Sequence, residues 1–117
     1  MSKGVKMDSG KPMMSLIPPH AEKVVAEVLT FGAEKYAPDN WRKVPDAERR
    51  YLDAAMRHLN AYRSGDQLDD ESGLPHLAHA ACCMLFLLEL SISPHPSFKN
   101  KRTVASGATL KDSEGYY

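Results

Sequence analysis

The chain has 117 residues, 43% of them hydrophobic and 26% charged, which is an ordinary composition for a soluble globular protein with one domain. Fifteen Lys and Arg balance fifteen Asp and Glu, so no net charge draws the chain to nucleic acid or to a membrane surface. The longest apolar run, near residues 77–90, is shorter than the roughly 20 residues of a membrane span, and the first fifteen residues lack the apolar run of a signal peptide. We therefore expect a cytoplasmic protein.

Residues 1–17 predict an extended N-terminal arm that lies over the body of the protein. The segment DSGKP at residues 8–12 carries turn-forming residues, and a short apolar patch follows it. Lys11 is a candidate contact for a ligand phosphate. The alternative is a solvated lysine, because the glycine-rich run of a P-loop is absent.

The proline pair at residues 18–19 begins a first helix. Its apolar residues recur at helical spacing from Ala21 to Lys35, which gives one buried stripe. Glu27 and Glu34 share a face of this helix. They either reach a metal or form a solvated edge.

Residues 35–43 combine aromatic and cationic side chains. Pro38 ends the first helix, and Asp39 and Asn40 supply a turn. Trp41 beside cations matches a nucleotide, with an aromatic platform for the base and positive charge for the phosphates. The alternative is that Trp41 closes the end of the core while the cations face solvent.

A second helix is predicted from residues 45–46 to about Tyr62, and the serine–glycine pair at residues 64–65 ends it. Asp53 and Arg57 are four residues apart and are expected to pair. His58 lies beside the predicted core stripe. That stripe consists of Leu52, Ala55, Met56, Leu59 and either Tyr62 or Arg63.

An acidic turn over residues 66–73 precedes a third helix, with Ser72 as its expected cap and Pro75 in its first turn. From residue 77 to residue 90 the helix is apolar on nearly every face, so it is either central or part of a subunit interface. Cys82 and Cys83 point about 100° apart on it and are expected to be reduced core residues. Residues 93–117 lack periodicity and predict a mobile tail.

These elements predict an all-α fold in residues 1–92, a helical bundle of three main helices per chain. Three helices enclose a core poorly, and the third is too apolar for a monomer. We therefore expect oligomerisation to complete the bundle, in a homodimer or a homotetramer.

Histidines and carboxylates gather around the acidic turn. Three histidines and four acids fall within about two dozen residues, a combination typical of metal or phosphate chemistry. The alternative is a solvated turn between core helices, with histidines that only pack. The residues are His58, His76 and His79, with Asp66, Asp69, Asp70 and Glu71.

Six segments in order resemble a known family. They are DSGKP (8–12), LIPP (16–19), FGAEKY (31–36), NWRK (40–43), RHL (57–59) and ESGLPHLAH (71–79). Together they resemble the bacteriophage dATP/dGTP diphosphohydrolases, which are related to the MazG-like all-α nucleoside triphosphate pyrophosphatases. The resemblance covers residues 5–91. It implies a helical, oligomeric enzyme that hydrolyses a purine deoxynucleoside triphosphate to the monophosphate and pyrophosphate with a divalent cation, in the host cytoplasm if phage-encoded.

The chain departs from the MazG-like pattern at the metal site. That group holds magnesium with a Glu-Glu-x-x-Glu helix and a Glu-x-x-Asp helix. The nearest counterpart here is DQLD at residues 66–69, with histidines after it. Imidazole suits Mn, Co or Zn better than Mg, so the identity of the metal stays open. The cofactor that the resemblance implies is a divalent metal: Mg, Mn or Co.

The leading hypothesis is metal-assisted hydrolysis of a phosphoanhydride bond. The expected metal ligands are His58, Asp66, Asp69, His76 and His79, and the expected catalytic residues are Asp69, Glu71 and His79. The expected substrate contacts are Lys11, Lys35 and Arg42 to phosphate, with Tyr36, Asn40 and Trp41 to the base or sugar. Two alternatives stay open. One is a triphosphohydrolase of the histidine–aspartate type, against which the lack of an adjacent His-Asp pair counts. The other is a non-enzymatic helical dimer or binding module.

Overall fold

Three α-helices form the body of the computed structural model, which describes residues 3–93. The helices are α1 (Pro19–Lys35), α2 (Ala47–Arg63) and α3 (His76–Ile92), with short 3-10 helices η1 (Met14–Leu16) and η2 (Asn40–Lys43). Between residues 3 and 93 no strand forms, and an isolated bridge joins Leu68 and Pro75. The predicted all-α fold with three main helices is confirmed. The predicted tail lies outside the described residues, apart from residue 93.

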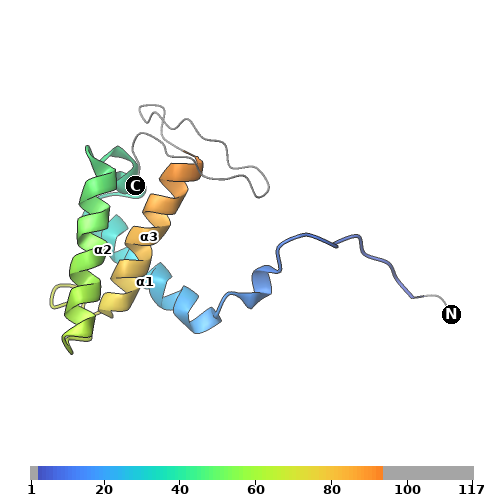
Figure 1. Ribbon diagram of the computed structural model, residues 1–117, viewed down its shortest axis with the longest axis horizontal. Helices are drawn as coiled ribbons and strands as arrows, with labels where there is room; N and C mark the ends of the chain where they lie inside the picture. The colour runs from blue at the N-terminus through green and yellow to red at the C-terminus, as the bar shows by residue number, and fades with distance from the viewer. Residues whose placement is uncertain (1–2, 94–117) are drawn as a thin grey trace.

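Helix α3 is the central helix, as its composition predicts, because it packs against both α2 and α1 (Figure 1). Its small side chains allow close approach: Ala78 and Cys82 form a buried cluster with Val28 of α1. Both cysteines are free thiols in the core, as expected. Burial raises the pKa of Cys82 to about 12 and that of Cys83 to about 11, so neither is a reactive thiolate at neutral pH.

The predicted core stripe of α2 is wrong in its position. Of its five members only Ala55 is buried, and the other four are 41% to 59% exposed. The inward face of α2 carries Ala47, Ala55 and the half-buried His58 instead. Alanine faces let α2 approach α3 closely, so the large apolar side chains are left on the opposite side of the helix.

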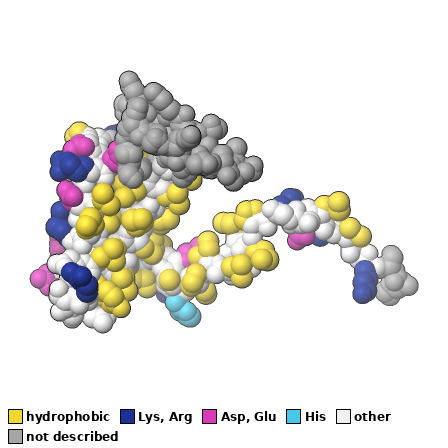
Figure 2. Space-filling view, viewed as in Figure 1, with side chains coloured by type: hydrophobic (Ala, Val, Ile, Leu, Met, Phe, Trp, Pro, Cys, Tyr) yellow, Lys and Arg dark blue, Asp and Glu magenta, His cyan; other side chains and the backbone are white. Residues whose placement is uncertain are grey.

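An apolar face therefore remains exposed over α2 and α3, where yellow side chains gather in Figure 2. We call it the α2–α3 face. Its members are Leu52, Met56, Leu59 and Tyr62 on α2 and Leu77, Met84, Leu85, Leu88 and Ile92 on α3, each at least 41% exposed. In the part of the chain that the structure describes, no helix is both long enough and apolar enough to cross a membrane.

The N-terminal arm does not lie over the body, which corrects the prediction. Residues 3–17 extend away from the helices, and all of them are exposed (Figure 1). Val5 is 86% exposed and Met7 is 79% exposed. Polar turn residues separate the two apolar patches of the arm, so too little apolar area would be buried to offset the entropy of ordering it on the body.

Candidate functional site

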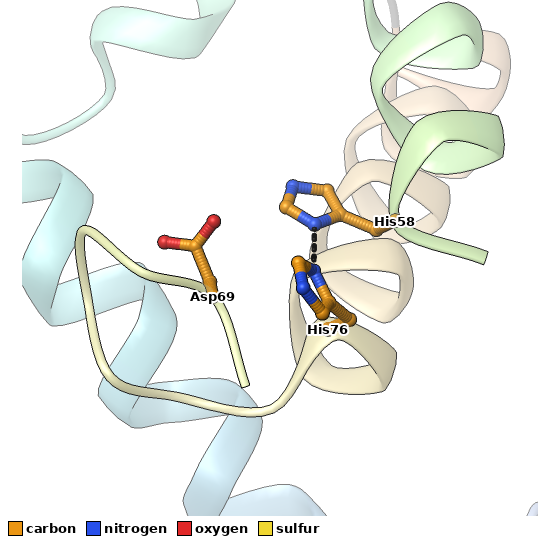
Figure 3. A group of neighbouring side chains, drawn as sticks. All are labelled: His58, Asp69 and His76. Atoms are coloured by element: carbon orange, nitrogen blue, oxygen red, sulfur yellow. Dashed lines mark hydrogen bonds between the residues drawn. The ribbon is translucent and has the colours of Figure 1, made fainter. Parts of the chain in front are cut away.

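Two histidines and an aspartate converge between α2, the loop that follows it and α3 (Figure 3). His58 belongs to α2, His76 begins α3, and Asp69 lies in the loop. One ligand atom from each side chain lies within 4.8 Å of the others. The Nδ1 atoms of His58 and His76 are 2.8 Å apart. Two bare lone pairs would repel at that distance, so a proton or a cation must lie between the two nitrogens.

His79 extends the cluster. Its ring stacks on His58, with the centroids 4.6 Å apart and the planes 15° from parallel. Its Nε2 is 2.7 Å from the Ser72 hydroxyl and 3.9 Å from Oδ2 of Asp69. The Ser72 oxygen also accepts the N–H of Leu74 at 3.1 Å, so Ser72 connects the His79 ring to the loop.

The loop between α2 and α3 fixes Asp69 through backbone hydrogen bonds. Gly65, with φ +101°, ends α2 as predicted. The Asp69 N–H donates to the Leu74 carbonyl at 2.8 Å. Its carboxylate oxygen Oδ2 accepts the backbone N–H groups of Glu71 and Ser72 at 3.1 and 2.9 Å. Oδ1 receives no hydrogen bond from residues 3–93 and is the oxygen available to a ligand.

Ser72 does not cap α3, which corrects the expectation. The helix begins at His76, and no side chain from residues 3–93 caps its first N–H groups. The N–H of His76 donates instead to the Gln67 carbonyl at 2.8 Å, and the N–H of Ala78 donates to the Pro75 carbonyl at 3.0 Å. Ser72 lies too far before the first turn to cap it, and its hydroxyl hydrogen-bonds with the His79 ring instead.

Burial and neighbouring charges set the protonation state of the cluster. Burial lowers the pKa of His58, and the nearby His79 and His76 lower it further. Burial also lowers the pKa of His79, against an opposite effect of Asp69. Burial acts to raise the pKa of Asp69, but hydrogen bonds from Ser72, together with the nearby His79 and His58, outweigh it and the pKa is lowered. Near pH 7, neutral His58 and His79 therefore face an ionised Asp69, which is the state in which these groups bind metals.

A cavity of about 920 Å³ opens beside the cluster, within the size range of small-ligand sites. Its walls come from α1, η2, α2, the loop and α3. Many of the residues that the sequence predicts for the site line it. They are Lys35, Tyr36, Asn40, Trp41, His58, Asp69, Glu71 and His79.

Four predicted site residues lie outside the cavity wall: Lys11, Arg42, Asp66 and His76. Lys11 is on the extended arm. Asp66 is exposed and accepts a hydrogen bond from Nε2 of His76 at 3.2 Å, so it orients that imidazole instead of joining the three converging ligand atoms.

The remaining acids of the sequence pattern take no part in the cluster. Asp70, Glu27 and Glu34 are exposed and are absent from the group of converging ligand atoms within residues 3–93. For the two glutamates of α1, the geometry favours the solvated edge that the sequence left open.

Three arginines of α2 line the cavity although the sequence analysis did not place them in the site: Arg49, Arg50 and Arg57. Arg50 and Arg57 are seven residues apart, a spacing that puts both on one helix face. That spacing is the signal by which they could have been found.

Trp41 is held between two other side chains. Phe86 stacks on it with centroids 4.5 Å apart and planes 13° from parallel. The Arg42 guanidinium lies 4.3 Å from its ring centroid. A stacked ring and a guanidinium cannot share one face at these distances, so both faces are covered. The geometry favours the interpretation in which Trp41 closes the end of the core, and it leaves Tyr36, which is 64% exposed, more accessible to a base.

These features define a class of protein: a small helical bundle in which imidazoles and a carboxylate meet beside a cavity with cationic walls, as a site for an anionic ligand requires. The chain belongs to the dATP/dGTP diphosphohydrolase family, because the model of that family's N-terminal region matches residues 1–101. This membership confirms the resemblance carried by the six sequence segments. The relation to the MazG-like enzymes stays a prediction.

A relative from Salmonella phage PMBT28, described as a dATP/dGTP diphosphohydrolase, is 36% identical over 112 residues. The match covers 96% of this chain and 38% of the relative, so the chain spans less than half of the length of that protein. No solved structure matches the chain.

Proposed function

We propose that the chain hydrolyses purine deoxynucleoside triphosphates, dATP or dGTP, to the monophosphate and pyrophosphate. The observation that carries the proposal is the convergence of His58, Asp69 and His76 within 4.8 Å beside a cavity lined with cations. The phage relative, described as a dATP/dGTP diphosphohydrolase, supports the choice of substrate. In the reaction, a water oxygen bonds to phosphorus, and the bond to the pyrophosphate oxygen breaks. The electron pair leaves on pyrophosphate, and the water proton passes to a base.

The residues present fit a divalent cation. Ligand atoms about 2.1 Å from one tetrahedral cation are about 3.4 Å apart, so atoms within 4.8 Å of one another would close around a cation through side-chain movements of about 1 Å. Two imidazoles and one carboxylate favour Mn, Co or Zn over Mg, which prefers oxygen. A cation held by His58, Asp69 and His76 would offset the negative charge of the triphosphate.

His79 is the residue best suited to take the proton. Its pKa is lowered by burial, so the imidazole is neutral and able to accept a proton near pH 7. Its Nε2 lies 2.7 Å from the Ser72 hydroxyl oxygen. Asp69, 3.9 Å from that nitrogen, stabilises the imidazolium that forms. Glu71 is held by Lys35 at 2.6 Å and shapes the wall of the cavity.

The base and sugar are proposed to contact Tyr36 and Asn40. Both line the cavity on the side of η2. Tyr36 is mostly exposed, and its ring offers a stacking surface. Lys35 Nζ lies 5.1 Å from the centroid of that ring, which keeps a cation near the place where a nucleotide would enter.

Two copies of the chain are proposed to pair through the α2–α3 face. Nine large apolar residues, each about half exposed, present on the order of 800 Å² of apolar surface, which is what one partner contributes to a standard interface. Packing this face on its symmetry copy would bring four helices together and complete a bundle.

The proposal is tested with a double variant, Asp69→Ala with His79→Ala, in a sample shown by circular dichroism to be folded. Turnover of dGTP with Mn or Co is expected to fall by at least about 100-fold, since a ligand and a base are lost together. A matched control is Glu34→Ala with Asp70→Ala, which removes two exposed acids outside the cluster. Metal-dependent turnover that survives in the first variant contradicts the assignment of the site.

A further inference from the structure

Among residues 3–93, four cationic side chains line the cavity, and three of them are already engaged within the protein. Lys35 lies 2.6 Å from Glu71. Arg49 bonds to Asp46 at 2.8 Å and to Asp53 at 3.3 Å, and Arg50 donates to the Pro45 carbonyl at 3.3 Å. The fourth is Arg57, which makes no hydrogen bond or ion pair with any residue from 3 to 93.

Arg57 has no partner among residues 3–93 because its expected partner, Asp53, pairs with another arginine. The sequence predicts a pair between Asp53 and Arg57, four residues apart, and that prediction is wrong. The Asp53 carboxylate bonds instead to Arg49, one turn earlier in α2. Arg49 is also fixed by Asp46, so the three residues form a closed group on the surface and leave the Arg57 guanidinium unpaired.

Arg57 lies in the part of the cavity that contains the histidines and the aspartate of the cluster. Arg57 directly precedes His58, and both line the same cavity together with Asp69 and His79. Cys83 of α3 lines this cavity too. Arg57 therefore shares the cavity with the cluster and with the wall formed by α3.

The phosphate contacts predicted from the sequence are less available. Lys35 is held by Glu71. Arg42 lies over Trp41 and is paired with Asp39 at 3.9 Å and with Glu89 at 4.0 Å. Lys11 is on the arm, outside the cavity wall. A triphosphate in the cavity would have to displace an existing partner at Lys35 or Arg42, but not at Arg57.

We propose that Arg57 binds the phosphate groups of the substrate and holds them against the His58–Asp69–His76 cluster. A guanidinium presents two parallel N–H groups that match two phosphate oxygens, and it stays charged at every relevant pH. The inference rests on the proposed function for the identity of the substrate. Its own content is narrower: the cavity binds a polyphosphate chain through Arg57.

The test compares Arg57→Gln with Arg63→Gln, a control on the same helix. Arg63 is exposed, bonds to Asn60 at 3.1 Å and lies outside the cavity wall. Binding of inorganic tripolyphosphate is measured by calorimetry in EDTA, and the KM for dGTP is measured with Mn. Arg57→Gln is expected to weaken tripolyphosphate binding and to raise the KM by about 10- to 100-fold, the loss typical of a charge-assisted contact. For Arg63→Gln, both the tripolyphosphate affinity and the KM are expected to stay within about twofold of wild type. Arg57→Lys is expected to recover part of the loss, because lysine keeps the positive charge but lacks the paired N–H groups of the guanidinium.

Tripolyphosphate affinity within twofold of wild type in a folded Arg57→Gln protein overturns the inference, as does a wild-type protein that binds no tripolyphosphate. The proposed function fails separately. If wild-type protein binds tripolyphosphate through Arg57 yet turns over neither dATP nor dGTP, the polyphosphate site stands and the assigned reaction falls.

Discussion

The substitution Trp41→Ala is expected to destabilise the fold while leaving nucleotide binding nearly unchanged. It removes a ring that stacks on Phe86 and is covered by Arg42. Truncation of a buried tryptophan costs about 3–5 kcal/mol. Trp41 is only partly buried, which favours the lower end, about 3 kcal/mol. Of this, the aromatic pair accounts for about 1 kcal/mol and the cation–π contact for about 0.5 kcal/mol.

The assay is thermal unfolding followed by circular dichroism. In a domain of this size, 1 kcal/mol shifts the melting temperature by about 4–8 °C, so Trp41→Ala is expected to lower it by about 12–24 °C. Trp41→Phe keeps an aromatic ring against Phe86 and is expected to lose no more than about 1–2 kcal/mol. The KM for dGTP is then measured at a temperature at which both variants are folded.

The stability and the KM of the variant together distinguish a structural tryptophan from one that stacks on the base. A structural Trp41 predicts a large loss of stability with a KM within about threefold of wild type, whereas base stacking is typically worth about 1–3 kcal/mol. A Trp41→Ala protein with wild-type stability and a KM raised by 10-fold or more would refute the structural assignment.

Three further predictions concern the cluster and the apolar face. Asp69→Asn is expected to lower the affinity for Mn or Co by at least about 10-fold, because a neutral amide replaces a carboxylate ligand; calorimetry checks this, and unchanged affinity would remove Asp69 from the site. Burial holds the pKa of His58 and His79 below their usual 6.5, so below about pH 6.5 the unfolded chain binds more protons than the folded one. Thermal melts of the metal-free protein should therefore show stability falling as the pH decreases through that range, and a flat profile would contradict the burial of these rings. Leu88→Glu is expected to convert a dimer or tetramer to a monomer in light scattering, with Met14→Glu on the arm as control; an assembly that persists would place the interface elsewhere.

The helices could be predicted from the sequence because their ends carry local signals. Pro38 follows the end of α1, and Gly65 adopts the positive φ that ends α2. The orientation of α2 could not be predicted, because the helix has two apolar faces. Residues such as Leu52 and Met56 outweigh Ala55 on any hydrophobicity scale, yet the close approach of α2 to α3 requires alanine.

The site could be predicted where its residues are neighbours in sequence. Asp69, His76 and His79 lie within one loop and the first turn of one helix, so spacing alone brings them together. The pairing of ions could not be predicted in the same way. Lys35 forms an ion pair with Glu71, which is distant in sequence. Asp53 pairs with Arg49 and not with Arg57. Both pairings depend on tertiary geometry. The cover on both faces of Trp41 likewise comes from α3 and η2 together.

Product analysis with each of the four deoxynucleoside triphosphates in the presence of Mg, Mn or Co tests the proposed function most directly. The expected result is that dATP and dGTP give the monophosphate and pyrophosphate in equal amounts, and that EDTA stops the reaction. Release of the deoxynucleoside and triphosphate would contradict it and favour a triphosphohydrolase. No turnover of any of the four nucleotides with any of the three metals, in protein shown to be folded, would contradict it as well.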